Sequence, residues 1–111
     1  MTKIQAIKAS IEHWQRMIAW AEKQPDWEEK KSFSMNKAIG EHWYGTNCPL
    51  CWKYTINNCF NCPLSKKYGF CSSNNKRNLW FFVTNSYNWG EWLINAKKFI
   101  KQLKSLLPKE K

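Results

Sequence analysis

No stretch of this 111-residue sequence approaches the roughly 18 consecutive apolar residues that a membrane-spanning helix requires. The first residues, Met1 to Gln5, also lack the apolar run of a secretory signal peptide. A phosphate-binding loop, a nucleophile elbow and the HExxH motif are absent too. The sequence therefore predicts a soluble, non-secreted protein that is not an enzyme. Its 43% hydrophobic content excludes wholesale disorder, and its length suits one domain covering residues 1–111.

Acidic residues are scarce in the second part of the chain. Residues 42–111 contain eleven Lys or Arg but only two Asp or Glu, a balance of +9, whereas residues 1–41 balance at +1. Such a field favours a polyanionic partner, although general solubility explains the same charge. Sixteen of the 18 cations are Lys, which favours diffuse phosphate attraction over the bidentate reading of bases.

An amphipathic helix is predicted at the N-terminus. Thr2 and Gln5 form a capping box at its start, and Gln24-Pro25 ends it. Its apolar stripe consists of Ile4, Ile7, Ile11, Trp14, Ile18 and Ala21. Short helical turns are expected from Trp27 and within residues 34–43.

A second amphipathic helix is predicted near the C-terminus. Asn88 and Glu91 mark its start, and Pro108 stops it. Its apolar face consists of Trp92, Leu93, Ala96, Phe99, Ile100, Leu103, Leu106 and Leu107. The opposite side carries Lys97, Lys98, Lys101 and Lys104. The helix dipole accounts for part of that basic side, because cations stabilise the C-terminal end of a helix.

The expected fold is mainly α, with the N- and C-terminal helices packed together because neither buries its stripe alone. A compact cysteine-rich metal-binding lobe lies between them. The expected division is a helical part at 1–43, the cysteine-rich lobe at 44–75, and an apolar segment with the C-terminal helix at 76–108. Within the last part, residues 79–83 suit either a strand or a buried helical turn.

The middle of the chain carries a short internal repeat. Residues 47–54 match residues 61–68 at six of eight positions. In both copies Pro follows Cys, and Pro suits the first position of a helical turn. Each such Cys would then lie at a helix start, where free N–H groups favour a thiolate. We expect two short helical turns, the second with Leu64 packed inward and Tyr68 near its end.

The cysteines are the strongest chemical signal. They fall within 24 residues and comprise Cys48, Cys51, Cys59, Cys62 and Cys71. Their number is odd, so a closed disulfide framework would leave a free thiol, and a reducing compartment is expected. Two CxxC pairs typically supply four thiolates to a tetrahedral zinc ion. The sequence therefore predicts zinc bound by four of the five cysteines.

The choice of the four ligands stays open. The two CxxC pairs are the default set. The repeat offers a rival set, since Ser65 stands where the first copy has its second Cys, and Cys71 would then replace Cys59. His42 is a substitute ligand that more often has a structural role. An iron–sulfur cluster, reduced or disulfide-bonded cysteines and a thiol–disulfide site at 48–51 are the other readings.

Cations and aromatic residues adjoin in the second part of the chain. Stacking of bases in a basic groove requires these residue types, although amphipathic packing produces the same composition. Trp14 and Trp92 lie on the apolar stripes and are assigned to the core. The candidate ligand-binding residues are Trp52, Lys53, Lys66, Lys67, Lys76, Arg77 and Trp80.

A further pattern joins the cysteine block to the end helices. It comprises Cys48-Pro49-Leu50-Cys51, then Cys59 with Cys62-Pro63-Leu64, then Gly69 and Cys71, then Trp89-Gly90-Glu91-Trp92, with residues 9–17 of the first helix. This set resembles a group of small cysteine-rich accessory proteins of tailed bacteriophages, over most of the chain. The group has no settled activity. The resemblance therefore implies an origin, and a site of action in the cytoplasm of a bacterial host cell.

These observations together predict a small zinc-stabilised accessory protein of phage type, whose basic, Trp-rich surface binds nucleic acid. The partner would be a polyanion, either nucleic acid or a nucleotide, and not a membrane. The alternative is an inhibitor of a bacterial host defence system, which binds a host protein or sequesters a signalling nucleotide. Monomer and homodimer both stay open, because the two apolar stripes can meet within one chain or across two copies.

Overall fold

The computed structural model describes residues 2–43, 63–68 and 79–108, and their regular elements are helices. These are α1 (Lys3–Ala21), α2 (Ser32–Ile39), α4 (Pro63–Tyr68), α5 (Trp80–Thr84) and α6 (Trp89–Lys104). The predicted mainly helical fold is thus confirmed for this part of the chain. None of its helices is long and apolar enough to cross a membrane.

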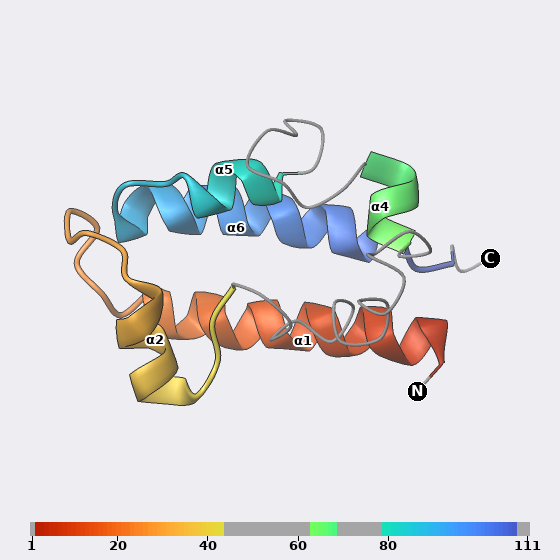
Figure 1. The fold of residues 1–111 in the computed structure, drawn as a ribbon, viewed down its shortest axis with the longest axis horizontal. Helices are drawn as coiled ribbons and strands as arrows, with labels where there is room; N and C mark the ends of the chain where they lie inside the picture. Colours follow the sequence, from red (N-terminus) through yellow and green to blue (C-terminus); the bar gives the residue numbers. More distant parts are fainter. Residues whose placement is uncertain (1, 44–62, 69–78, 109–111) are drawn as a thin grey trace.

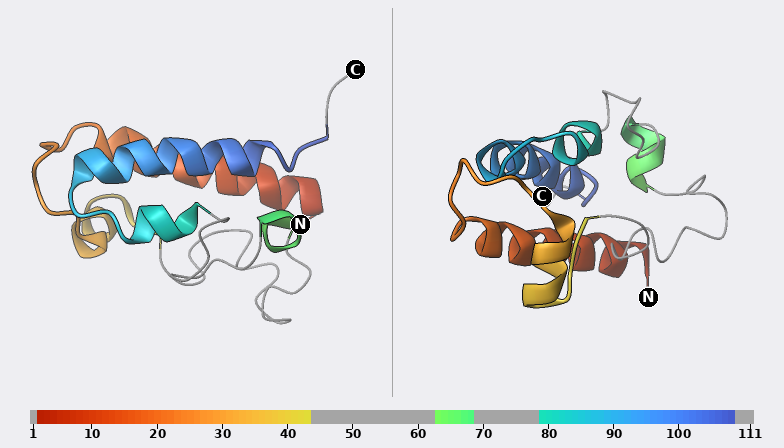
Figure 2. Two further views of the ribbon diagram at one scale, coloured as in Figure 1. Left: turned by 90° about the horizontal axis from the view of Figure 1, so that it is seen from above. Right: turned by 60° about the vertical axis from the view of Figure 1, so that its left-hand side comes forward.

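The two long helices form the frame of the molecule. α1 and α6 run antiparallel and side by side, α5 lies along α6, and α2 packs against α1 (Figure 1). Seen from above, α2, α4 and α5 all lie on one side of the α1–α6 pair, as the left view of Figure 2 shows. The other side of the pair carries no further described helix. The predicted packing of the N- and C-terminal helices is confirmed.

The start of α1 follows from its first four residues. Thr2 Oγ1 accepts a hydrogen bond of 3.1 Å from the Gln5 N–H, and Gln5 Oε1 accepts one of 2.8 Å from the Thr2 N–H. This is the predicted capping box. The helix ends at Ala21, earlier than predicted, because the chain tightens into turns before Pro25. The Lys23 N–H bonds to the Trp20 carbonyl three residues back, in place of a helical bond.

The predicted short helix from Trp27 is wrong. The backbone there forms a turn, followed by an isolated antiparallel bridge between Glu29 and Asn88. The Trp89 N–H also donates to the Glu28 carbonyl at 3.0 Å. The first N–H groups of a helix have no partner within it, and this loop supplies one to α6. The loop is therefore shaped by α6 rather than by its own capping pattern.

The second helix is longer than the turn expected within residues 34–43, since α2 begins at Ser32. Met35 is fully buried. Gly40 ends the helix with a φ of 71°, a left-handed conformation that costs glycine little, and its N–H donates to the Asn36 carbonyl at 2.8 Å.

Of residues 79–83, Leu79 lies in a turn and residues 80–83 belong to helix α5 and not to a strand. The short helix α5 buries Val83 and packs along α6. Two side chains satisfy the Phe82 carbonyl near its end: Ser86 Oγ donates at 2.7 Å and Asn95 Nδ2 at 3.3 Å. Because α6 provides both the apolar surface and a donor, the helical alternative is the stable one.

The core lies between α1 and α6. The residues predicted to be buried are at most 8% exposed, namely Ile7, Ile11, Trp14, Ile18, Phe99, Ile100 and Leu103. Ile4, the first residue of the predicted apolar stripe, is 40% exposed because it lies in the first turn at the end of the helix pair. Leu106 and Leu107 lie beyond the end of α6, which stops before Pro108, and are partly buried.

Four tryptophans fill this core, two more than the sequence assigned to it. Trp14 and Trp92 are confirmed as core, and Trp43 and Trp89 are also at most 4% exposed. The Trp14 and Trp92 rings stack at 6.0 Å between centroids, while Trp89 meets Trp92 edge to face at 5.7 Å. The indole N–H groups of Trp14 and Trp92 are buried without a hydrogen-bond acceptor among the described residues. Each such unsatisfied N–H group destabilises the folded state by about 1–3 kcal/mol, so this loss partly offsets the stability that the buried rings provide.

Replacing Trp92 by Ala should lower the free energy of unfolding by about 3–5 kcal/mol, because a fully buried ring leaves a cavity among three other indoles. The matched control is Trp27→Ala, in which a ring that is 78% exposed is removed, with an expected change within about 0.5 kcal/mol. Denaturant unfolding followed by circular dichroism, at low protein concentration, measures both. Equal losses in the two variants would contradict the assignment of the core.

Candidate functional site

The structure describes only part of the predicted site. The predicted residues that lie outside the described part are Cys48, Cys51, Cys59, Cys62, Cys71, Trp52, Lys53, Lys76 and Arg77. Lys66, Lys67 and Trp80 lie within it. Residues 2–43, 63–68 and 79–108 contain no group of three or more His, Cys, Asp or Glu side chains placed to hold a metal ion. The zinc ligands remain a prediction from sequence.

The second copy of the repeat forms the predicted helical turn. α4 begins at Pro63, Leu64 is buried at 3% exposed, and Tyr68 is the last helical residue. The Tyr68 hydroxyl lies 2.8 Å from Ser105 Oγ, and Lys67 Nζ donates to the Ser105 carbonyl at 3.3 Å. These contacts attach α4 to the C-terminal end of α6.

Trp80, one of the candidate ligand-binding residues, lies at the edge of the core. Its ring is half-buried against the core, and its Nε1–H donates to the Trp43 carbonyl at 3.1 Å. The neighbouring Leu79 N–H donates to Gln102 Oε1 at 2.9 Å. Trp43 and Trp80, which lie on either side of the five cysteines in the sequence, are therefore close together in the fold.

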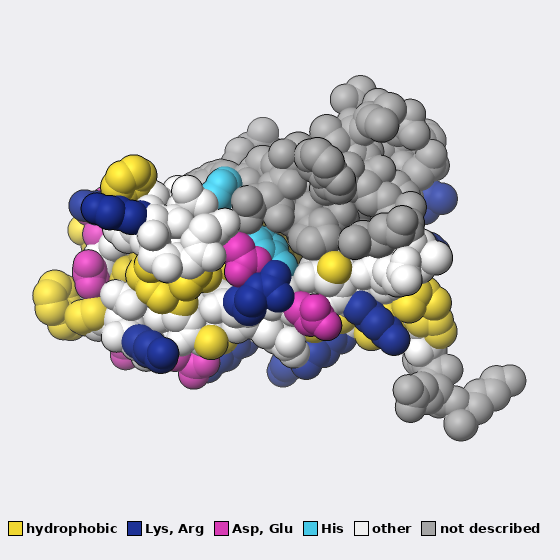
Figure 3. All heavy atoms as spheres, turned by 90° about the horizontal axis from the view of Figure 1, so that it is seen from below, with side chains coloured by type: hydrophobic (Ala, Val, Ile, Leu, Met, Phe, Trp, Pro, Cys, Tyr) yellow, Lys and Arg dark blue, Asp and Glu magenta, His cyan; other side chains and the backbone are white. Residues whose placement is uncertain are grey.

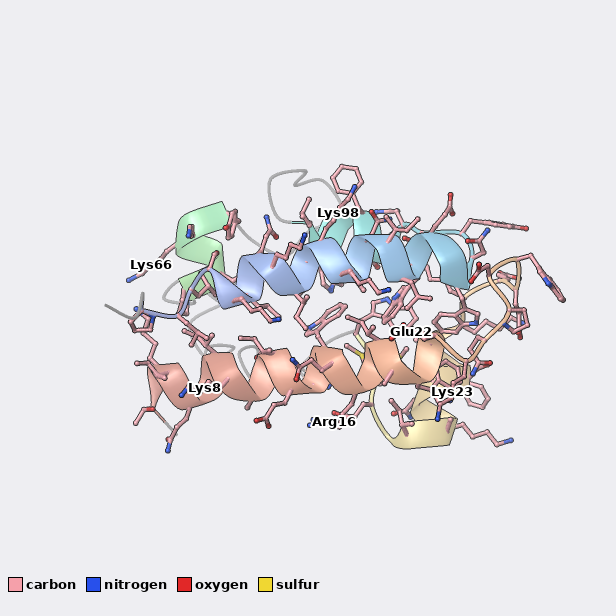
Figure 4. All side chains as sticks on the ribbon, turned by 180° about the vertical axis from the view of Figure 1, so that it is seen from behind. Lys8, Arg16, Glu22, Lys23, Lys66 and Lys98 are labelled. Atoms are coloured by element: carbon pink, nitrogen blue, oxygen red, sulfur yellow. The ribbon has the colours of Figure 1, made fainter. Side chains whose placement is uncertain are left out.

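Exposed lysines line the side of the helix pair that α2, α4 and α5 leave uncovered. Figure 4 faces this side, with Lys98 on α6, Lys66 on α4 and Lys8 on α1. We define the lysine face as six residues of α4 and α6, namely Lys66, Lys67, Lys97, Lys98, Lys101 and Lys104, all of them exposed. Lys97, Lys101 and Lys104 are spaced four and three residues apart, so they lie in one row along α6.

Little negative charge opposes the lysine face. Lys97 Nζ lies 3.8 Å from a Glu22 carboxylate oxygen, and both side chains are more than half exposed, so the pair contributes little. Among the described residues, no carboxylate forms an ion pair with Lys98, Lys101 or Lys104. The face therefore carries a net positive charge that favours an anion.

A shallow groove borders this face, between the first half of α1 and the end of α6. It has a volume of about 380 Å³ and is lined by Lys8, Ile11, Glu12, Gln15, Lys104 and Leu107. Lysines from both helices flank an apolar floor. Neither helix stripe alone indicated this juxtaposition, because it depends on how the two helices are paired.

A partly buried ionic cluster links α1 to the residues after α2. His13 is 1% exposed, with Nδ1 2.8 Å from Glu41 Oε1 and Nε2 3.2 Å from the His42 carbonyl oxygen. Both partners are oxygen acceptors, so a ring nitrogen that carries a proton donates to them. Arg16 completes the cluster through two hydrogen bonds to Glu41, from Nε at 2.7 Å and from Nη2 at 2.6 Å.

The cluster changes the acidity of its members. The hydrogen bonds from the Arg16 guanidinium, assisted by His13, hold the pKa of Glu41 below its ordinary value, although partial burial opposes this shift. The same bonds raise the pKa of Arg16. The sequence has two adjacent acid–histidine pairs, Glu12-His13 and Glu41-His42, but the carboxylate that meets His13 is that of Glu41. The sequence signal for this pairing was the position of His13 beside the apolar stripe of α1, where a polar side chain can be partly enclosed.

No family model, curated protein or solved structure matches this chain. The chemistry of this protein therefore follows from the side chains that its fold exposes. His13 is buried and satisfied within the structure, and therefore serves the fold rather than a substrate. The lysine face is exposed and uncompensated, so it is the described surface best suited to a ligand, and phosphate groups match its chemistry.

Replacing Glu41 by Gln should lower the free energy of unfolding at neutral pH by about 1–2 kcal/mol, because two charge-assisted bonds are lost. The folded-state pKa of Glu41 is lowered, so its contribution is fully present above about pH 4.5 and disappears as the pH falls through the lowered value. Wild type and variant should therefore converge in acid. Urea unfolding at neutral pH and well below pH 4.5 measures this, with Glu28→Gln in the exposed loop as the matched control. An unchanged difference at both pH values would contradict the pairing.

Proposed function

We propose that this protein is a small zinc-stabilised accessory protein of phage type that binds nucleic acid through its lysine face. The observation that carries the proposal is the row of exposed lysines along α6, with Lys98 on the uncovered side of the helix pair and the exposed lysines of α4 at the end of α6. The chain's formal charge of +10 supplies the long-range attraction that such a face needs.

The spacing of the lysines supports a polyanionic ligand. Like charges three or four residues apart on a helix repel one another by about 0.2–0.5 kcal/mol per pair. Lys97, Lys101 and Lys104 stand in such a row, and a phosphate backbone laid along it would replace repulsion by attraction. Each ammonium is a point charge without the planar fork that reads bases. The proposed binding is therefore to the phosphate backbone and largely independent of sequence.

The proposal includes a bound zinc ion because the cysteines are spaced as two CxxC pairs. Two observations on the described residues support it. α4 begins at Pro63, directly after Cys62, as the repeat predicted. The Trp80–Trp43 bond holds together the two points between which the cysteines lie, so a metal there would close a segment already anchored at both ends.

The charge reversal Lys98→Glu with Lys101→Glu should weaken binding of a labelled oligonucleotide by at least about tenfold at low salt, and reduce the slope of log K against log salt by about 2. Fluorescence anisotropy with single- and double-stranded probes at several salt concentrations measures both.

The matched control for this experiment is Lys31→Glu with Lys37→Glu, which changes the charge equally at the opposite end of the molecule. Its affinity should stay within about threefold of wild type. Equal loss in both variants would indicate general charge attraction and no specific face. No binding of either probe, with capture of a small nucleotide or a host protein instead, would favour the inhibitor of host defence.

Elemental analysis of the purified chain should find one zinc per molecule, and a chelator should lower its unfolding midpoint, because thiolate ligation is coupled to folding in small domains. Cys48→Ser should lose the metal, whereas Ser65→Ala should retain it. Visible absorption bands would indicate an iron–sulfur cluster instead. Absence of metal, with five free thiols in a folded chain, would remove zinc from the proposal without affecting the lysine face.

A further inference from the structure

Three large aromatic side chains are exposed at one end of the molecule. Trp27, in the loop between α1 and α2, is 78% exposed; Phe33, in the first turn of α2, is 74% exposed; and Tyr87, between α5 and α6, is 70% exposed. We call these three residues the aromatic patch. Soluble monomers seldom leave large apolar groups together at the surface unless the surface binds something.

The aromatic patch is displayed by a backbone that is held in place. The Gly90 N–H donates to the Asp26 carbonyl at 3.0 Å, and the Lys30 N–H donates to the Tyr87 carbonyl at 3.2 Å. A Cβ on Gly90 would lie 3.2 Å from that of Asp26, so the loop and the start of α6 are in close contact. The loop that carries Trp27 is therefore tied to α6 on both sides, and docking would not first have to order it.

Charge distinguishes this end from the rest of the chain. Residues 22–40 and 85–91, which build it, contain five acidic and four basic residues, a balance of −1 against +10 for the whole chain. Figure 3 shows exposed hydrophobic side chains at the left-hand end, with both basic and acidic side chains among them. A phosphate backbone would gain no attraction here, so the aromatic patch serves a different ligand from the lysine face.

We propose that two copies of this chain associate through the aromatic patch, about a two-fold axis. The rest of the chain carries a balance of +11, so contact through its other surfaces brings like charges together. A two-fold interface pairs a surface with itself and therefore needs both signs of charge on one patch. This end has them, since Asp26, Glu28, Lys31 and Lys37 all belong to it and are all exposed. Trp and Tyr are moreover the residues most enriched at the centres of interfaces.

The available area fits a dimer of modest strength. Three large aromatic side chains, each about three-quarters exposed, offer roughly 450 Å² per copy. A standard interface takes about 800 Å² from each partner, so the aromatic patch supplies more than half and its polar surroundings the remainder. Such a dimer leaves α4 and the end of α6 uncovered, since they lie at the opposite end of the molecule (Figure 1).

Sedimentation velocity of the full chain in reducing buffer, which prevents intermolecular disulfides, tests the proposal. The dimer fraction of wild type should rise with concentration and persist in high salt, because the contact is mainly apolar. Trp27→Ser with Tyr87→Ser should sediment as a monomer at the same concentrations. Ile4→Ser, which removes an exposed apolar group at the other end of α1, should dimerise as wild type does.

A charge variant provides an independent arm. Glu28→Lys with Glu29→Lys changes the balance of this end from −1 to +3 and should weaken dimerisation at low salt, with recovery as salt screens the repulsion. Lys98→Glu with Lys101→Glu should lose nucleic acid but still dimerise, so failure of one proposal is separable from failure of the other. Circular dichroism verifies that every variant is folded. A wild type that stays monomeric at all concentrations, or a dimer unaffected by Trp27→Ser with Tyr87→Ser, would overturn the proposal.

Discussion

Burial of four indole rings along the α1–α6 pair is the constraint on which the rest of the structure depends. Two antiparallel helices of this length bury little area alone, and the bulk of Trp14, Trp43, Trp89 and Trp92 supplies it. Indole N–H groups of Trp14 and Trp92 are left without acceptors among the described residues as a consequence. The free energy gained from apolar burial and ring packing has to exceed that cost. The stacked and edge-to-face contacts between the rings contribute to this gain.

The packing of the same core determines on which side of the helix pair the lysines of α6 lie. Because α2, α4 and α5 cover one side of the helix pair, the lysines on the outward stripe of α6 stand on the other side, where solvent and counterions reach them. The loop between α1 and α2 accepts hydrogen bonds from the first N–H groups of α6. In this position of the loop, the Trp27 side chain is exposed to solvent. A basic face and a nearly neutral aromatic end thus arise from one packing arrangement.

Two polar connections complete the frame. The cluster of His13, Arg16 and Glu41 fixes the chain after α2 against α1, and the Trp80–Trp43 bond fixes α5 to the same place. Trp43 and Trp80, which the second connection joins, lie on either side of the stretch of sequence that contains all five cysteines.

Local chemistry decided what could be read from the sequence. The apolar stripes of α1 and α6, the Thr2–Gln5 capping box and the helical turn starting at Pro63 follow from helix periodicity and capping, which act within a few residues. The helical state of residues 80–83, the bridge at Glu29 and the pairing of His13 with Glu41 needed the tertiary structure. Each of them depends on a partner far along the chain: α6 for the first two, and a residue 28 positions away for the third. Periodicity places a side chain on a face of its own helix, but only the packing of that face against another element determines which buried groups, exposed rings and rows of charge it will meet.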